Sequence, residues 1–138
     1  MLKLKIPCNI FEQMLQQAKA EAPIEACGIL AGRDGQVERL YKMTNADQSS
    51  DHFMMATEEQ FKVVKDIRAA SLEILAIYHS HPASPARPSQ EDIKLALTPD
   101  VVYVIVSLQN ANAPVLKGFL IENGTVAEVH VKIVKESK

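Results

Sequence analysis

The stretch Glu-Ile-Leu-Ala-Ile-Tyr-His-Ser-His-Pro, residues 73–82, carries the most information in this chain. Its first half is apolar and predicts a buried β-strand that runs directly into two histidines. Side chains two positions apart point to the same face of a strand, so His79 and His81 can face one ion while Ser80 points the other way. Pro82 favours extended backbone at the preceding residue and preserves this alignment.

A serine and an aspartate follow the two histidines, at Ser89 and Asp92. Two imidazole nitrogens and one carboxylate oxygen are the ligands of an open, hydrolytic zinc site, which keeps a fourth position for water. We therefore predict that His79, His81 and Asp92 bind one Zn²⁺ per chain. Ser89 is also expected to cap a short helix that runs through Leu97, with its hydroxyl proton free to donate to an oxyanion.

Hydrolysis by a zinc-activated water also requires a base that accepts the water's proton. Four glutamates are candidates on chemistry alone, and their spacing does not choose among them: Glu25, Glu58, Glu73 and Glu91. Each of them, taken singly, has the character of a solvated surface charge. The residues by themselves therefore leave the identity of the base open.

Length and composition are those of a single globular domain, which we expect to span residues 1–138. The formal net charge is -2 with both signs interspersed, which predicts neither a nucleic-acid partner nor binding to an anionic membrane surface. The longest apolar runs are far shorter than the ~20 residues of a membrane span. Two widely spaced cysteines, Cys8 and Cys27, are typical of free thiols in a reducing cytoplasm.

Periodic patterns predict the remaining elements. Strands are expected at residues 2–6, 26–32, 37–41, 52–55, 73–78, 101–108, 115–121 and 129–133, and helices at residues 10–18, 57–71 and 89–97. A capping box at Thr57 and Gln60 is expected to open the middle helix. The apolar residues of that helix are expected to pack in the core: Phe61, Val64 and Ile67. Together these elements predict one mixed sheet flanked by helices.

Three segments together closely resemble the JAMM (MPN+) metalloprotease family: residues 23–32, 79–82 and 88–92. The family pattern is a glutamate shortly before Cys-Gly or a similar pair, then His-Ser/Thr-His-Pro, and then Ser-x-x-Asp, with seven residues between the second histidine and the serine (here Pro82 to Pro88). Every part is present here in order, and the order of helices and strands extends the resemblance from about residue 2 to residue 134. It implies an α/β fold, a three-layer α/β/α sandwich with a mixed, curved sheet similar to that of cytidine deaminases.

The resemblance also implies a role for each site residue. His79, His81 and Asp92 would hold the catalytic zinc. Glu25 would move a proton from the attacking water to the leaving amine, and Ser89 would help to hold the oxyanion. The family cleaves isopeptide or peptide bonds after the C-terminal Gly-Gly of ubiquitin or ubiquitin-like proteins. The short prokaryotic members, which this chain resembles, have ubiquitin-like sulfur-carrier proteins as their implied substrates, and a homodimer is compatible with the resemblance.

Two alternatives stand beside this function. A zinc amidohydrolase acting on small peptides or small molecules would use the same residues without a protein substrate. A metal-free MPN scaffold or dimerisation module is disfavoured, because all five residues of the predicted site are intact. Outside the site we assign no catalytic role to the other polar residues that stand out: His52, His130, Cys27 and Arg87.

Overall fold

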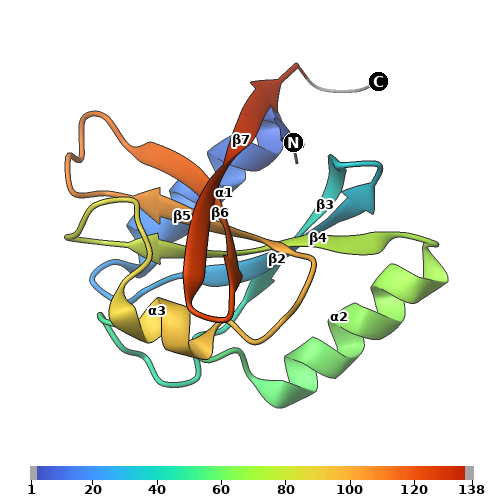
Figure 1. Cartoon of the computed structure of the whole chain (residues 1–138), viewed down its shortest axis with the longest axis horizontal. Helices are drawn as coiled ribbons and strands as arrows, with labels where there is room; N and C mark the ends of the chain where they lie inside the picture. Colours follow the sequence, from blue (N-terminus) through green and yellow to red (C-terminus); the bar gives the residue numbers. More distant parts are fainter. Residues whose placement is uncertain (1–2, 136–138) are drawn as a thin grey trace.

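A single sheet is the central feature of the computed structural model, which describes residues 3–135 (Figure 1). Within these residues seven strands form the sheet: β1 (Lys3–Pro7), β2 (Cys27–Arg33), β3 (Gln36–Met43), β4 (Glu73–His81), β5 (Val102–Ser107), β6 (Val115–Glu122) and β7 (Thr125–Val134). The same part of the chain contains three helices: α1 (Cys8–Glu21), α2 (Thr57–Ala69) and α3 (Gln90–Leu95). None of these three helices combines the length and the hydropathy of a membrane span.

The sheet is mixed and closes on itself. Its strands are hydrogen-bonded in the order β1-β3-β2-β4-β5-β6-β7, and β1 also pairs with β7. Strand β4 is parallel to β5, and β1 is parallel to both of its neighbours, while the other neighbouring pairs are antiparallel. The predicted mixed, curved sheet is confirmed. The three-layer sandwich is not confirmed, because the sheet is closed where a sandwich has an open middle layer.

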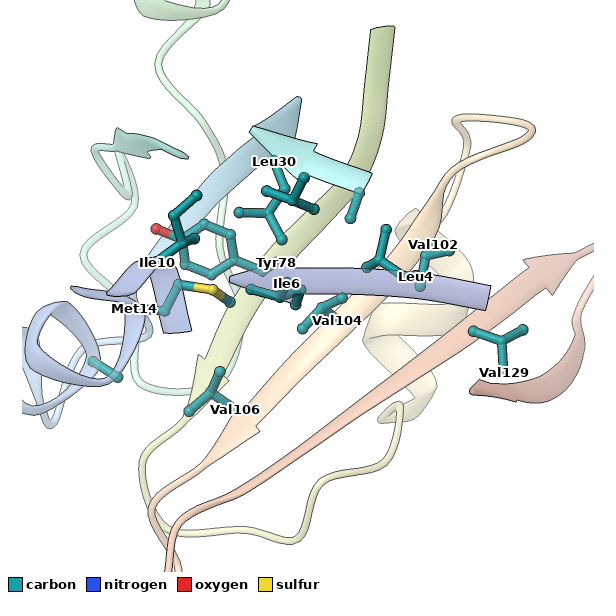
Figure 2. Close-up of a cluster of buried hydrophobic side chains, with 13 residues drawn as sticks. Leu4, Ile6, Ile10, Met14, Leu30, Tyr78, Val102, Val104, Val106 and Val129 are labelled. Carbon is teal, nitrogen blue, oxygen red and sulfur yellow. The ribbon is translucent and has the colours of Figure 1, made fainter. Parts of the chain in front are cut away.

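Alternation along the central strands gives the sheet two apolar faces. Helix α1 packs on one face through Ile10 and Met14. These two side chains belong to a cluster drawn in Figure 2 that also contains Leu4, Ile6, Leu30, Tyr78, Val102, Val104, Val106 and Val129. The opposite face carries two smaller clusters, one that includes Ile67 of α2 and one that includes Ile93 of α3. In Figure 1 strands β2, β4 and β5 accordingly run between α1 and the two other helices.

A buried polar contact fixes α1 against β2 and β4. The Tyr78 hydroxyl donates to the side-chain carbonyl of Gln17, whose amide donates to the Cys27 carbonyl at 2.9 Å. Gly28 leaves room for the Tyr78 ring, since a Cβ atom at this position would lie 2.3 Å from the ring's Cε1. Cys27 is also paired in register with His79. The start of β2 is therefore held beside the end of β4, where the predicted site lies.

The predicted capping box of α2 is wrong. The helix begins at Thr57 with Ala56 as its N-cap, and this cap makes no side-chain hydrogen bond. The Thr57 hydroxyl is one position too late to serve as the cap. The side-chain amide of Gln60 donates instead to the Met55 carbonyl at 3.0 Å. The first turn of α2 is thus held by a different contact from the one that the sequence pattern predicts.

Phe61 was expected in the core, and this prediction is also wrong, because its side chain is 68% exposed. Helix α2 covers the sheet through Val63 and Ile67. At 100° per residue, Phe61 lies about 200° around the helix from Val63 and therefore faces outward. The predicted strand at residues 52–55 is reduced to an isolated bridge between Asn45 and Met55, and α3 ends two residues before the expected Leu97.

Candidate active site

The two histidines of β4 lie at its carboxyl end and share one face of the strand. His79 is 1% exposed and His81 is 4% exposed, so both rings are almost fully enclosed. Their neighbours in sequence, Tyr78 and Ser80, point to the opposite face, as strand alternation requires. The apolar first half of β4 lies within the sheet, between β2 and β5, so the histidines project from a rigid element.

Asp92 reaches the histidines from the first turn of α3. Ser89 is the N-cap of this helix: the Asp92 amide donates to Ser89 Oγ at 3.0 Å, and the Ser89 amide donates to Asp92 Oδ2 at 2.9 Å. This reciprocal pair is a capping box, and it fixes the carboxylate in one orientation. The same Oδ2 atom also contacts both histidines, so Asp92 takes part in the cap and in the cluster together.

The three side chains each bring one atom to a common point. The Nε2 atoms of His79 and His81 are 3.2 Å apart. Asp92 Oδ2 lies 3.0 Å from His81 Nε2 and 3.2 Å from His79 Nε2. Ligands placed tetrahedrally around a zinc ion, at about 2.0–2.1 Å from it, are separated by about 3.3 Å. The donor atoms, their spacing and their burial therefore fit a metal ion held by three protein ligands.

Burial and hydrogen bonding set the protonation states of this cluster. Burial raises the pKa of Asp92, but hydrogen bonds from both histidines and from the Ser89 amide outweigh it and hold the pKa well below its usual range. Burial lowers the pKa of His79 and favours its neutral imidazole. At His81 burial also acts to lower the pKa, but the bonds to Asp92 and to the Pro85 carbonyl raise it. A carboxylate beside a neutral imidazole is ready to bind a cation.

The second ring nitrogen of His81 has a defined partner. His81 Nδ1 lies 2.8 Å from the Pro85 carbonyl oxygen. A carbonyl oxygen only accepts, so Nδ1 carries a proton, and loss of the Nε2 proton that contacts Asp92 leaves a neutral ring with its Nε2 lone pair facing the cluster. The loop of residues 82–88 therefore orients one of the predicted ligands.

Glu25 lies just before β2 and is 2% exposed, and its Oε1 atom has no hydrogen-bond partner among residues 3–135. Burial raises its pKa to about 8; His81 acts to lower the pKa, whereas Asp92 and Asp51 raise it further. The structure exposes the other three glutamates that the sequence left open: Glu58, Glu73 and Glu91. A buried carboxyl group with a pKa near neutrality is suited to accept and release a proton.

An open cleft of about 520 Å³ connects part of the predicted site to solvent. Glu25, His81 and Ser89 line it, together with Pro23, Ser50, Asp51, Pro82, Ala83 and Ser84. The first three residues of the loop that follows β4, residues 82–84, form one wall and leave the cleft accessible. A larger cavity of about 690 Å³ lies between the end of α3 and the turn from β6 to β7, and none of the predicted site residues lines it. The cleft lined by Glu25, His81 and Ser89 is therefore the candidate active site.

Ser80 connects the two halves of the site. It lies between the two histidines in sequence, and its Oγ accepts a hydrogen bond from the Ala26 amide at 2.8 Å. The Ser80 amide in turn donates to the Ala26 carbonyl at 2.9 Å. Since Ala26 follows Glu25 directly, these two bonds fix the glutamate relative to the histidine strand. The serine of the His-Ser-His segment thus has a positional role that its spacing alone did not reveal.

Sequence reasoning missed Asn45, a buried residue just beyond β3 that is 3% exposed. Its amide donates to the carbonyls of Glu25 and His52 at 3.0 Å each. Its Oδ1 atom accepts from the amides of Asp47 and Met54, both at 3.2 Å. One side chain therefore ties the segment that carries Glu25 to the loop of residues 45–55. An asparagine in a polar stretch gives no sequence signal for such a role.

The residues to which we assigned no catalytic role lie outside the cluster. Cys27 is fully buried, and burial raises the pKa of its thiol to about 12. His52 is partly exposed and pairs with Asp47 at 2.9 Å, and Arg87 and His130 are exposed. None of them belongs to the group of side chains whose donor atoms converge, which consists of His79, His81 and Asp92 among the described residues.

A family model described as prokaryotic homologs of the JAB domain matches residues 7–117. The chain belongs to this family. The resemblance to short prokaryotic JAMM/MPN proteins, which the motifs predicted, is thereby confirmed.

Relatives of this JAB-family chain match it over most of their length. A CysO-cysteine peptidase from Mycobacterium tuberculosis is 38% identical over 135 residues, covering 96% of this chain and 92% of the relative. A probable TtuB-protein conjugate cleaving protease from Thermus thermophilus is 37% identical over 113 residues, covering 81% and 75%. The solution structure of protein DSY2949 from Desulfitobacterium hafniense has a TM-score of 0.89 and 44% identity, covering 96% and 94%.

Proposed function

We propose that this JAB-family protein is a zinc-dependent peptidase that cleaves the amide bond after the C-terminal Gly-Gly of a ubiquitin-like or sulfur-carrier protein. One observation carries the proposal: the ligand atoms of His79, His81 and Asp92 converge beside a cleft that also contains the buried Glu25. The names of two relatives support the substrate class, since one is a CysO-cysteine peptidase and the other a probable TtuB-protein conjugate cleaving protease.

The metal ligands and the base have separate tasks in the proposed reaction. His79, His81 and Asp92 hold the ion. When bound, zinc would act as a Lewis acid that polarises the scissile carbonyl, and it would lower the pKa of a water toward ~7. Glu25 accepts the proton of the attacking water on its unpaired carboxylate oxygen and passes it to the leaving amine. Its raised pKa allows it to hold that proton between the two transfers.

Ser89 stabilises the oxyanion that forms when water adds to the carbonyl. Its Oγ accepts the Asp92 amide proton at 3.0 Å, which occupies a lone pair and leaves the hydroxyl proton free. Ser89 also lines the cleft, so this proton can be donated to a substrate oxygen. The cap of α3 therefore places the oxyanion donor next to the metal ligand of the same helix.

We further propose that one domain carries this activity in the cytoplasm, where the two free cysteines stay reduced. The proposed partners are the carrier substrate and, for a homodimer, a second copy of the chain. The net charge of -2 argues against nucleic acid and anionic membranes as partners.

The test uses two versions of a sulfur-carrier protein, one extended after Gly-Gly by a cysteine and one joined through Gly-Gly to the side chain of a lysine peptide. We expect cleavage directly after Gly-Gly, loss of cleavage in a chelator, and recovery when Zn²⁺ is restored. Equal rates on a free Gly-Gly-Cys tripeptide would instead indicate a small-peptide amidohydrolase. A protein that neither binds zinc nor cleaves any of these substrates would contradict the proposal and favour the scaffold alternative.

A further inference from the structure

The two histidines of the cluster are oriented in different ways. A metal-bound histidine normally donates its second ring N–H to a carbonyl or carboxylate, which fixes the ring plane. His81 follows this rule through its contact with the Pro85 carbonyl at 2.8 Å. His79 does not: its Nδ1 atom is buried and makes no hydrogen bond with any group among residues 3–135. Apart from the contact of its Nε2 atom with Asp92, the His79 ring is therefore held by packing.

The His79 ring packs against the face of Phe53. The centroids of the Phe53 and His79 rings are 4.7 Å apart and their planes are inclined by 26°, which is a stacked arrangement. A small pocket beside the two rings is lined mainly by apolar side chains, those of Leu95, Tyr103, Ile105 and Ile121, with His52 and Asp92 as its other members. Rotation of the imidazole would break the stacking without gaining a hydrogen bond.

Phe53 is itself held in place by the buried Asn45 amide. Asn45 bonds the two residues that flank the phenylalanine, donating to the His52 carbonyl at 3.0 Å and accepting from the Met54 amide at 3.2 Å. The Ala46 amide also donates to the Met54 carbonyl at 2.7 Å. The backbone on either side of Phe53 is therefore fixed, and its ring is presented to β4 in a defined position.

We propose that Phe53 is a positioning residue that sets the ring plane of His79 and so takes the part usually played by a hydrogen bond to the second ring nitrogen. This inference rests on the proposed function, because it takes His79 as a metal ligand. Phe53 acts through His79 and makes no contact with the substrate in this role. Loss of an outer partner of a metal-bound histidine typically weakens metal binding by about 10–100-fold.

The experiment compares Phe53→Leu with the unaltered protein. Leucine keeps the apolar character but removes the flat ring face. We expect zinc affinity, measured by competition with a chromophoric chelator, to fall about 10–100-fold, and the visible absorption spectrum of the Co²⁺-loaded protein to change as the ligand geometry loosens. Phe53→Tyr retains the ring face and should keep both properties close to those of the unaltered protein. Phe61→Leu makes the same chemical change at an exposed site on α2 and should alter neither.

The outcomes separate this inference from the proposed function. If the unaltered protein binds no zinc, the proposed function fails. If it binds zinc and Phe53→Leu binds with the same affinity and the same Co²⁺ spectrum, the positioning role is overturned while the function stands. Urea unfolding in chelator shows whether each variant is folded. Should Phe53→Leu not fold, Phe53→Met replaces it under the same criteria.

Discussion

Glu25→Gln separates proton transfer from metal binding better than any other single change in this site. Glutamine has nearly the same shape as glutamate but cannot accept the proton of water. Because a general base contributes about 10²–10⁴-fold to a rate, we expect kcat to fall by this factor. The metal ligands are untouched, so zinc content should remain near one per chain. Glu91→Gln, at an exposed glutamate in the first turn of α3, is the matched control and should keep full activity.

The same substitution has a consequence for stability that can be worked out from the structure. The pKa of Glu25 is raised from 4.5 to about 8 because the carboxyl group is buried. The folded state therefore favours the protonated form, and its stabilising effect is fully present below pH 4.5 and is lost as the pH rises through about 8. At about 1.4 kcal/mol per pKa unit the shift corresponds to at most ~5 kcal/mol, and relaxation of the surroundings with entry of water from the adjoining cleft reduces this to ~2–3 kcal/mol.

Glutamine carries no charge at any of these pH values. Metal-free wild-type protein should therefore lose about 2–3 kcal/mol of unfolding free energy relative to Glu25→Gln between pH 5 and pH 9. Urea unfolding of both proteins in chelator, at pH 5, 7 and 9, measures this difference. Two stability curves that stay parallel across the range would refute the reasoning about burial. A Glu25→Gln protein with wild-type kcat would remove this residue from the mechanism.

Three further predictions follow from contacts around the site. His81→Ala removes one of three ligands, so zinc content by elemental analysis should fall to near zero together with hydrolysis; retention of one zinc per chain would contradict the ligand assignment. Ser89→Ala removes the N-cap acceptor of α3 and the oxyanion donor, so it should cost about 1 kcal/mol in urea unfolding and about 10²–10³-fold in kcat; an unchanged kcat would leave Ser89 with the cap alone. Gly28→Ala would place a Cβ atom 2.3 Å from the Tyr78 ring, so it should lower the unfolding free energy by about 1–3 kcal/mol; an unshifted denaturation midpoint would show that the ring moves freely.

The parts of the site that the sequence could predict are those set by local geometry. His79 and His81 share a face because a strand alternates, and Ser89 and Asp92 meet because a helix begins there. Strand β4 and helix α3, which carry these residues, are also close in the chain, so their relative placement depends only on the short loop between them. For these four residues a pattern of fixed spacing was enough to predict the arrangement.

The parts that could not be predicted depend on contacts between distant segments. From the residues alone, Glu25 was one of four acids, because its burial arises only when residues 22–26 pack beside β4. In the sequence Asn45 cannot be told from any other polar loop residue, because its role depends on the hydrogen bond from its side-chain amide to the distant Glu25 carbonyl. The outward position of Phe61 depends on which stripe of α2 meets the sheet. Closure of the sheet likewise requires β1 to pair with β7 at the far end of the chain, which no local pattern encodes.

The ion-holding residues come from one short segment, whereas the proton acceptor comes from far away in the chain. Only 11 positions separate His81 from Asp92, but 54 separate Ala26 from Ser80 at the contact that places Glu25. Because the entropy of loop closure grows with the logarithm of loop length, the longer closure costs about 1.4 kcal/mol more. We expect a refolding chain to regain its metal before it regains its base. Zinc content would then overestimate the active fraction of a partly refolded sample. Its specific activity should therefore be calculated per molecule in which Glu25 is also in place.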